Sequence, residues 1–263
     1  MSTQYNKIRA PYDAIREKSI ALIERENIHT TLSPYISSAH VLDLACGTGF
    51  YTHSFIPWGA RSVHGIDISP PMLAQARLLT PPSQTPRTTF TLADCSHPTP
   101  YPGGPYDIVF GAWLLNYAPT RAALVEMFRN IALNLLPGGH FISVTVPPTN
   151  DPTASIDAET RVRPPPEGSE GLVYTKLRDV EDGVFFHVHG ETGVGDVDFE
   201  CFHLRREVYE GAAREGGLGG ELRWGGTSVP ERWLRGEGEG GAEVEELRSY
   251  GEVPGYGILV VGK

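Results

Sequence analysis

Short apolar runs alternate with helical patterns through the first 150 residues of the chain. Five runs rich in β-branched and other apolar side chains predict strands at 41–45, 63–68, 88–92, 106–110 and 140–146. Apolar residues at helical spacing predict helices over 50–58, 70–79 and 119–136. Strands that alternate with helices pair in parallel through right-handed crossovers, so this pattern predicts a doubly wound α/β sheet.

The alternation of strands and helices stops after the fifth predicted strand. Residues 147–170 are rich in proline and lack periodicity, which predicts a loop or lid. Farther along the chain we expect a helix, two more strands and a mobile glycine-rich segment, at 206–216, 221–224, 257–262 and 236–241.

Two alternating runs within residues 184–202 predict an antiparallel hairpin. With 190–195 as its loop, His189 pairs with Asp196 and His187 with Asp198. One face of the hairpin is then apolar, and it consists of Val184, Phe186, Val188, Val197, Phe199 and Cys201. The other face carries both histidines with the acidic residues, so the hairpin is expected to bury one side only.

Charge and glycine are concentrated in the second part of the chain. The first 150 residues hold 10 basic and 9 acidic side chains, whereas the last 113 hold 12 and 23, and the net charge is -10. An acidic chain without a basic run is a poor nucleic-acid binder or electrostatic membrane anchor. There is also no apolar stretch of about 18 residues, no secretory signal, and too few cysteines for a disulfide framework. We therefore expect a cytoplasmic protein, either a monomer or a homodimer.

The first predicted strand leads into the glycine motif Val41-Leu42-Asp43-Leu44-Ala45-Cys46-Gly47-Thr48-Gly49-Phe50. Gly47 and Gly49 allow a tight turn and let the backbone approach a ligand closely. Asp43 is more informative, because a carboxylate inside an apolar strand is costly unless something binds it. A positively charged group of a ligand, such as an amino-acid ammonium, would satisfy it.

Further acidic residues follow the next two strands. Asp67 ends the second strand, 20 residues after Gly47, at the position from which a carboxylate accepts ribose hydroxyls in such sheets. Asp94 follows the third strand, where it can accept the exocyclic amine of adenine. Each of them alone could equally be a helix N-cap or lie in a solvated turn. Their recurrence at the carboxyl ends of consecutive strands indicates a nucleotide-like ligand.

These motifs resemble those of class I S-adenosylmethionine-dependent methyltransferases, in the branch that acts on small molecules of specialised metabolism. The resemblance covers residues 41–146: DLACGTG, GID, ADC, YDIVFGAWLLNYA and LLPGGHF follow in order. It implies a seven-stranded, mostly parallel sheet with an antiparallel last strand and a hairpin or lid inserted after strand five. It also implies one domain over 1–263, made of a helical cap (1–40), a cofactor-binding core (41–146), a lid and hairpin (147–205) and a final helix with strands (206–263).

The resemblance also implies roles for individual residues. The ligands expected for S-adenosyl-L-methionine, or for its product S-adenosyl-L-homocysteine, are Tyr5, Tyr12, Asp43, Ala45, Gly47, Gly49, Asp67, Ile68, Met72, Asp94, Cys95, Gly111 and Ala112. A small-molecule acceptor is expected against Trp113, Asn116 and Tyr117, although these residues could also be plain core. Since the pocket residues are mostly aromatic, the acceptor is expected to have apolar surface.

Methyl transfer to an oxygen or nitrogen atom needs a general base only when the acceptor is protonated. The candidates for the base are His187, His189 and His203, and none of them stands out. The two hairpin histidines opposite two aspartates could bind a divalent metal, but a solvated face of opposite charges is the simpler interpretation. We therefore expect no metal requirement.

Two other functions are compatible with parts of the sequence. A nicotinamide-dependent oxidoreductase would have a third small residue in the glycine fingerprint where this chain has Thr52, and would not need Asp43. A protein that binds the cofactor and acts as a cyclase or as a non-catalytic partner would keep the cofactor contacts unchanged. The sequence favours the transferase over the oxidoreductase and leaves this last alternative open.

Overall fold

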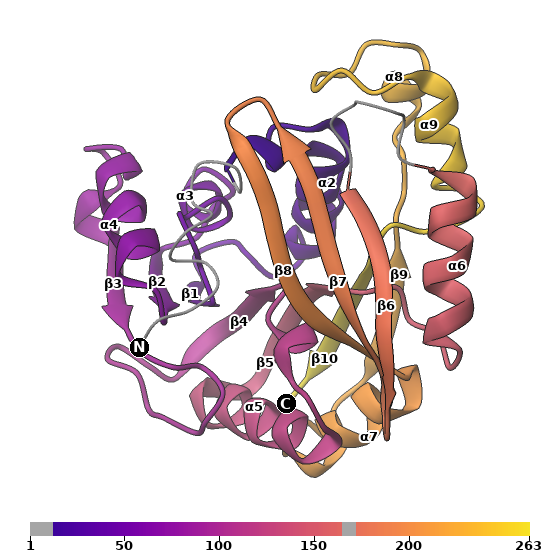
Figure 1. Ribbon diagram of the computed structural model, residues 1–263. Coiled ribbons are helices and arrows are strands. Elements are labelled where there is room, and N and C mark those ends of the chain that lie inside the picture. The colour runs from indigo at the N-terminus through magenta and orange to yellow at the C-terminus, as the bar shows by residue number, and fades with distance from the viewer. Residues whose placement is uncertain (1–12, 165–171) are drawn as a thin grey trace.

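The main sheet has seven strands in the order β3-β2-β1-β4-β5-β10-β9 (Figure 1). The computed structural model describes residues 13–164 and 172–263. The seven strands are β1 (His40–Leu44), β2 (Ser62–Asp67), β3 (Thr88–Leu92), β4 (Tyr106–Ala112), β5 (Leu135–Thr145), β9 (Leu222–Gly226) and β10 (Gly257–Gly262). β1 to β5 pair in parallel, while β10 runs antiparallel to both β5 and β9. The predicted doubly wound sheet with an antiparallel last strand is confirmed.

The helices around these strands are α2 (Ser19–Leu32), α3 (Thr52–Phe55), α4 (Pro70–Leu79), α5 (Arg121–Asn134), α7 (Arg206–Glu215), α8 (Glu231–Leu234) and α9 (Val244–Ser249), with 3-10 turns η2 (Thr85–Arg87) and η3 (Leu115–Tyr117). α2 lies in the predicted helical cap, and α3, α4, α5 and α7 overlap predicted helices, whereas α8 and α9 were not predicted. α4 matches its prediction at both ends, whereas α3 is a single turn instead of the nine residues expected at 50–58.

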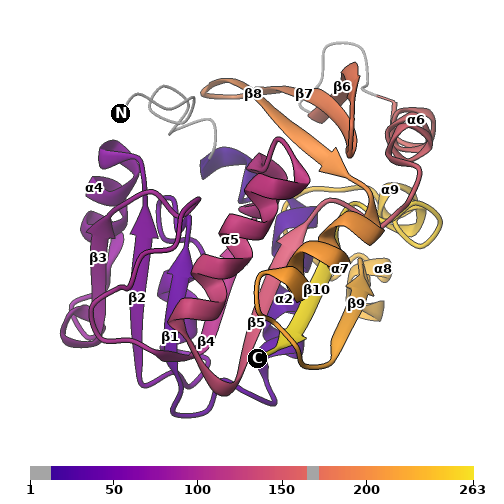
Figure 2. The same ribbon diagram turned by 90° about the horizontal axis from the view of Figure 1, so that it is seen from below.

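The two faces of the main sheet build two separate cores, because successive side chains of a strand point to opposite sides. Val41 and Phe110 join the cluster that contains residues of α2 and α3. Leu42 and Val109 join the cluster that contains residues of α5 and α7. Figure 2 shows α5 and α7 on one side of the sheet and α2 behind it. This sandwich fixes the strand ends from which the candidate site is built.

A second, three-stranded sheet follows β5. It has the order β6-β7-β8, with β6 (Leu172–Val180), β7 (Gly183–Thr192) and β8 (Gly195–Leu204), and it is preceded by helix α6 (Pro152–Val162). The loop predicted for 147–170 is therefore wrong over the length of α6. Its N-terminus is capped, since Asp151 Oδ1 accepts from the Ala154 N–H at 3.0 Å, but only Pro152 and Ile156 are buried. With only two buried positions, α6 has no apolar stripe at helical spacing, and so the sequence pattern did not predict it.

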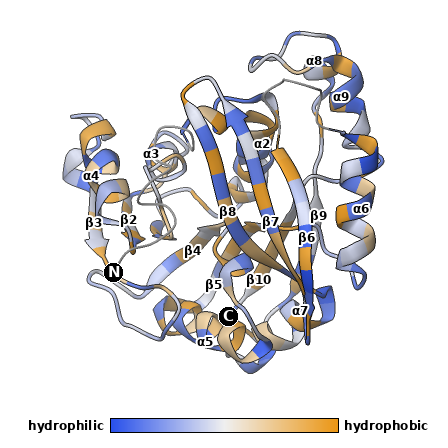
Figure 3. Cartoon of the chain, in the orientation of Figure 1, coloured by the Kyte–Doolittle hydropathy of each residue, from blue (hydrophilic) through white to orange (hydrophobic). Residues whose placement is uncertain are grey.

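The loop between β7 and β8 is shorter than predicted. His189 pairs with Asp198, and His187 with Glu200, so the predicted pairing is wrong by two residues. The strands continue to Thr192 and Gly195, which are paired, and the Thr192 hydroxyl donates to the Gly195 carbonyl at 2.6 Å. Because the side-chain period of a strand is two, this shift leaves every residue on its predicted face. Figure 3 shows the resulting bands of hydrophilic and hydrophobic residues along these strands.

The small sheet lies beyond the carboxyl ends of the parallel strands, toward which the arrowheads of β1 and β2 point in Figure 2. Ligands of open α/β sheets bind at this edge, where the strand order reverses. Here the reversal lies between the neighbouring strands β1 and β4. No helix in the described ranges has the length and apolar character that a membrane span requires.

Candidate active site

The glycine motif forms a tight turn at the carboxyl end of β1. Gly47 and Gly49 both have positive φ, +55° and +91°, which other residues adopt only with strain. A Cβ on Gly47 would meet no atom within 4 Å, whereas a Cβ on Gly49 would lie 2.5 Å from the His53 ring. Gly47 therefore borders open space, while Gly49 is needed for close packing against a side chain.

Asp43 lies inside β1 and is only 2% exposed. Its carboxylate accepts a short hydrogen bond from the Thr52 hydroxyl. Burial raises its pKa to about 7, against the lowering effect of that hydrogen bond and with a smaller contribution from the negative charge of Asp67. The protein thus keeps a carboxyl at the site that changes its charge near neutral pH.

Asp67 and Asp94 lie at the ends of the next two strands. Asp67 accepts from the backbone N–H groups of Gly47 and Ser69, at 2.8 Å each, and these bonds oppose the increase in its pKa that burial causes. Asp94 Oδ1 accepts from both the backbone N–H and the hydroxyl of Ser96, at 2.9 and 2.6 Å. Each aspartate therefore also stabilises the turn in which it lies. This agrees with the alternative, given in the sequence analysis, that each carboxylate has a structural role.

A small hollow opens between β1 and β4. It is lined by Arg16, Asp43, Ala45, Cys46, Gly47, Thr48, Phe50, Tyr51 and Ala112. Ala45, which lines the hollow, and Trp113, which follows the lining residue Ala112, have left-handed backbones with φ of +56° and +58°. For residues other than glycine that conformation costs on the order of 1–2 kcal/mol, and such strain gathers at functional sites.

A much larger cavity of about 660 Å³ adjoins the hollow. Residues of α2, α6, α9, η3 and the small sheet line it, together with the loop before β10. Its walls include aromatic and aliphatic side chains, among them Trp113, Tyr117, Ile156, Tyr174, Phe186, Phe199 and Tyr250. Arg16 lines both the hollow and the cavity, so the two spaces border on the same side chain.

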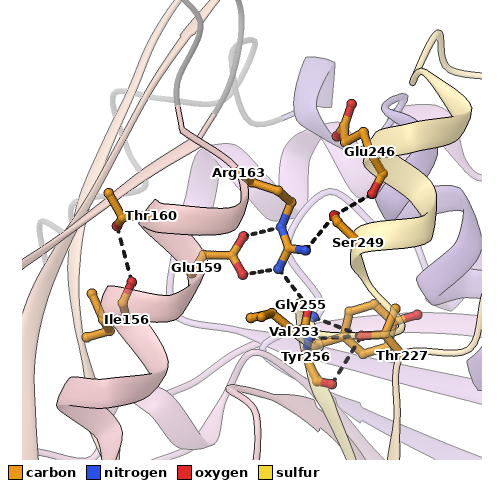
Figure 4. Close-up of polar contacts among 10 residues, drawn as sticks. All are labelled: Ile156, Glu159, Thr160, Arg163, Thr227, Glu246, Ser249, Val253, Gly255 and Tyr256. Carbon is orange, nitrogen blue, oxygen red and sulfur yellow. Dashed lines mark hydrogen bonds and ion pairs between the residues drawn. The ribbon is translucent and has the colours of Figure 1, made fainter.

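The outer wall of the cavity is held together by Arg163 at the end of α6 (Figure 4). Its guanidinium pairs with Glu159 through two nitrogens, donates to the Ser249 hydroxyl at 2.8 Å and to the Val253 carbonyl at 2.7 Å, and lies 4.0 Å from the Tyr250 ring centre. These contacts join α6 to α9 and to the chain that leads into β10.

A buried carboxylate on α2 was not found from the sequence. Glu24 is 3% exposed and accepts from Arg16 Nη1 at 3.0 Å, from the Tyr51 hydroxyl at 2.6 Å and from Trp113 Nε1 at 3.1 Å. The signal that could have found it is its position in an apolar stripe, between Ile20 and Ile28 at helical spacing.

Comparison with known proteins identifies the domain that carries this site. Residues 41–139 match the family model described as a methyltransferase domain. A trans-aconitate 2-methyltransferase of Methylobacterium nodulans is 34% identical over 107 residues, which are 40% of this chain and 38% of that relative. The protein of that name from Delftia acidovorans is 33% identical over 109 residues, with 40% and 37% covered. The chain contains an S-adenosylmethionine-dependent methyltransferase domain.

Solved structures share the fold of this chain over most of its length. A methyltransferase from Mesorhizobium loti superposes with a TM-score of 0.59 and 19% identity, covering 90% of this chain and 96% of its own. The CcbJ methyltransferase from Streptomyces caelestis gives 0.60 and 16%, covering 99% and 98%. The matched segment spans less than two fifths of the length of either curated relative, so those relatives do not establish the acceptor.

The methyltransferase domain brings only some of the predicted ligands together. Asp43, Ala45, Gly47 and Ala112 line the hollow. The others lie next to it or near the ends of β2, β3 and β4, namely Gly49, Asp67, Ile68, Asp94, Cys95 and Gly111, except for Met72, which lies in the first turn of α4. Trp113, Asn116 and Tyr117 all line the large cavity. Tyr5 and Tyr12 lie outside the described residues.

The three histidine candidates separate into two places. His203 is 2% exposed and lines the cavity, where its Nε2 donates to the Pro147 carbonyl at 2.9 Å and burial lowers its pKa to about 4. His187 and His189 both bond to Asp198, and these hydrogen bonds lower the pKa of that carboxylate. They lie on the face of β7 opposite to the cavity-lining Phe186 and Val188. In the parts of the chain that are described, no three His, Cys, Asp or Glu side chains are arranged to hold a metal ion.

Proposed function

We propose that this protein transfers the methyl group of S-adenosylmethionine to an oxygen or nitrogen atom of a small, partly apolar metabolite, in a pathway of specialised metabolism. The main support is that the cavity of about 660 Å³ meets the glycine-turn hollow at Arg16. A cofactor on one side and an acceptor on the other would then face each other beside the reversal point of the sheet. The cavity has the size of a small-molecule site, since such sites commonly measure about 300–1,000 Å³.

The residues at the strand ends fit the expected cofactor. Gly47 presents its backbone to open space, which allows the amino-acid end to approach. Asp67 accepts from the backbone N–H groups of Gly47, Ser69 and Ile68. Since a carboxylate has about four acceptor sites, about one remains for a ribose hydroxyl. Asp94 Oδ1 bonds to Ser96, which leaves Oδ2 for the adenine amine. The adenine would lie against Ile68, Met72 and Cys95, and the methionine end against Asp43, Ala45, Gly49, Gly111 and Ala112.

When bound, the cofactor supplies a methyl group on a sulfonium, which is a good leaving group. The chain's own contribution is then to hold the acceptor atom in line with that methyl and to exclude water. Positioning of this kind supplies up to about 7–11 kcal/mol of rate enhancement. Trp113 and Tyr117 follow β4, next to Ala112 of the hollow, so they would form the part of the acceptor wall nearest to the methyl.

Proton removal is the weaker part of this chemistry. Among the three histidine candidates only His203 reaches the cavity, and a pKa of about 4 makes it a poor base near neutral pH. Its Nε2 carries a proton, since a carbonyl oxygen only accepts, and so Nδ1 could accept from the substrate. These histidines favour an acceptor that needs no strong general base, such as an unprotonated amine.

The acceptor should be neutral or cationic. Among the described residues that line the cavity are six glutamates, at 24, 159, 191, 243, 245 and 246, against Arg16, Lys18 and Arg163. Both arginines already pair with glutamates. A polyanion such as trans-aconitate, the compound in the names of the curated relatives, would meet repulsion in this cavity.

We further propose that the whole chain acts as one unit. Residues 41–146 would bind the cofactor, and the cap, the lid and hairpin and the final elements would form the acceptor side. The cavity lining supports this division, because it draws residues from α2, the small sheet, α6 and α9.

The test has a binding arm and a transfer arm. Calorimetry should detect S-adenosylhomocysteine and not NADH, and incubation of the cofactor with a metabolite panel should give one product heavier by a methyl group. Ile156→Trp, which projects into the cavity, should abolish transfer and keep cofactor binding, whereas Leu177→Trp on the exposed part of β6 should change neither. Binding without transfer to any acceptor would contradict the catalytic proposal, and NADH binding would contradict the cofactor.

A further inference from the structure

Asparagine side chains are buried at three of the described positions, and they differ in how well they are bonded. Asn116, Asn130 and Asn134 are 2%, 0% and 3% exposed. Asn130 Oδ1 accepts from the Thr99 N–H at 2.9 Å, and its Nδ2 donates to the Cys95 carbonyl at 3.1 Å. The Asn134 amide is likewise bonded through both its oxygen and its nitrogen. Of the three, Asn116 is the one whose Oδ1 has no hydrogen-bond partner.

This unpartnered oxygen belongs to the wall of the large cavity. Asn116 lies in η3 and lines the cavity, whereas Asn130 and Asn134 lie in α5 and do not line it. A buried carbonyl without a donor destabilises a folded protein, so it requires an explanation. A ligand in the cavity that carries an N–H or O–H group would supply the missing donor.

Cys201 of β8 orients the Asn116 amide. The amide donates a hydrogen bond to the Cys201 sulfur, and burial raises the pKa of that thiol to about 12, so the sulfur stays neutral. Cys201 also lines the cavity. Because the nitrogen and the oxygen of an amide lie on opposite sides of a planar group, Oδ1 points away from the sulfur. The group that Asn116 offers to a ligand is therefore an acceptor.

The neighbouring groups of the cavity wall are acceptors as well. His203 lies two positions after Cys201, so both side chains are on one face of β8. Since His203 Nε2 donates to the Pro147 carbonyl, its Nδ1 is an acceptor. Such a wall complements an N–H or O–H group and repels the lone pairs of an ether, an ester or a carboxylate.

We propose that Asn116 Oδ1 accepts a hydrogen bond from an N–H or O–H group of the methyl acceptor, and that Cys201 is the positioning residue that orients the Asn116 amide. The cavity then selects apolar molecules that carry such a donor, as aromatic amines, indoles and phenols do, over the corresponding ethers and esters. This inference rests on the proposed function, because it concerns the acceptor side of the same site. It assigns the selection to η3 and to the small sheet.

The test compares two probes on the protein loaded with S-adenosylhomocysteine. Indole has one N–H donor, and 1-methylindole has the same ring system without it. In calorimetry the wild type should bind indole at least about fivefold more tightly than 1-methylindole. Asn116→Leu, which keeps a similar side-chain size and removes the acceptor, should abolish or reverse this preference, because the extra methyl then meets an apolar side chain.

Asn150 provides the matched control for the binding comparison. It is exposed and does not line the cavity, so Asn150→Leu makes the same chemical change elsewhere and should keep the preference for indole.

The role of Cys201 is tested by two substitutions of similar size. Cys201→Ser keeps an acceptor for the Asn116 amide and should keep most of the preference for indole. Cys201→Ala removes that acceptor, so the amide can rotate and the preference should fall. Equal preferences in the two variants would contradict the positioning role.

A thermal unfolding measurement without ligands separates binding from a structural role. Asn130→Leu should lower the Tm by at least about 4 °C, because it leaves two backbone groups without their partners. Asn116→Leu should leave the Tm within about 2 °C or raise it, since it removes an oxygen that no protein group satisfies. A loss in Asn116→Leu as large as that in Asn130→Leu would show a structural role and overturn the proposal.

The remaining outcomes separate this inference from the proposed function. Failure of the wild type to bind S-adenosylhomocysteine overturns both. If the loaded wild type binds the two indoles equally, or binds neither, the assignment of Asn116 is overturned and the proposal of methyl transfer stands.

Discussion

Replacing Asp43 with asparagine removes a buried titrating group and keeps its size. In the folded protein the Asp43 pKa is raised from its ordinary value of 3.8 to about 7 because the carboxyl is buried. Between these two pH values the folded protein keeps a proton that the unfolded chain releases. The free energy of unfolding of the wild type therefore falls as pH rises through this interval and levels off above about 7. Asparagine does not titrate, so Asp43→Asn is free of this loss.

The size of the effect follows from the same interval. About 3 pH units at 1.36 kcal/mol each give about 4 kcal/mol as the largest advantage of Asp43→Asn over the wild type above pH 7. This value is an upper limit, because the carboxamide introduces N–H donors into a site where Asp43 is 2% exposed and bonds to the Thr52 hydroxyl. Near pH 4 the two proteins should differ little.

Urea unfolding of both proteins at pH 4, 5.5, 7 and 8.5, without cofactor, measures this difference as on the order of 1–4 kcal/mol that appears with rising pH. Thr52→Val should extend the interval to higher pH, since it removes the hydrogen bond that lowers the Asp43 pKa. A stability difference between Asp43→Asn and the wild type that is the same at all four pH values would refute the reasoning. Asp43→Asn should also weaken the binding of S-adenosylhomocysteine above pH 7, where the ionised Asp43 carboxylate of the wild type attracts the ligand's ammonium.

Four further predictions address other parts of the molecule. Asp67→Ala should weaken S-adenosylhomocysteine at least about tenfold in calorimetry, and unchanged affinity would remove the ribose assignment. Gly49→Ala should lower the free energy of unfolding by about 2–4 kcal/mol, because φ is +91° and the new Cβ would lie 2.5 Å from His53. Gly138→Ala, at φ +77° in open space, should lower it by only about 1–2 kcal/mol. Equal losses would contradict the packing argument. Arg163→Ala should cost about 2–3 kcal/mol in urea unfolding by detaching α6 from α9, and an unchanged midpoint would show that the wall does not depend on it. Methyl transfer should survive EDTA, and its loss with recovery on adding Mg²⁺ would establish a metal requirement.

The main sheet could be predicted because its evidence is local. Each strand is an apolar run, and each connection carries its own stop signal in glycine, proline or serine. The antiparallel last strand followed from the family resemblance and not from the pattern itself. Helix α6 was missed for a physical reason: only Pro152 and Ile156 are buried, so the helix depends on its Asp151 cap and on tertiary contacts such as those of Arg163.

The hairpin of β7 and β8 shows which of its features a sequence pattern can predict and which it cannot. Alternation fixed which side chains of β7 and β8 share a face, because that depends only on odd and even positions. It did not fix the register, which moved by two residues to a two-residue loop at Gly193 and Val194. A register shift by an even number of residues leaves the same side chains buried, so the burial pattern cannot distinguish the two registers. The geometry of the turn decides between them.

The sequence by itself determined the strand ends where Gly47, Asp67 and Asp94 stand, because turn chemistry and acidic strand ends are properties of neighbouring residues. Only the tertiary structure decided the acceptor side. Glu24 and Trp113 are 89 positions apart and yet share a hydrogen bond, and the cavity collects residues from α2 to the chain before β10. Contacts between distant segments depend on how the elements pack, and no periodicity along the chain encodes that packing.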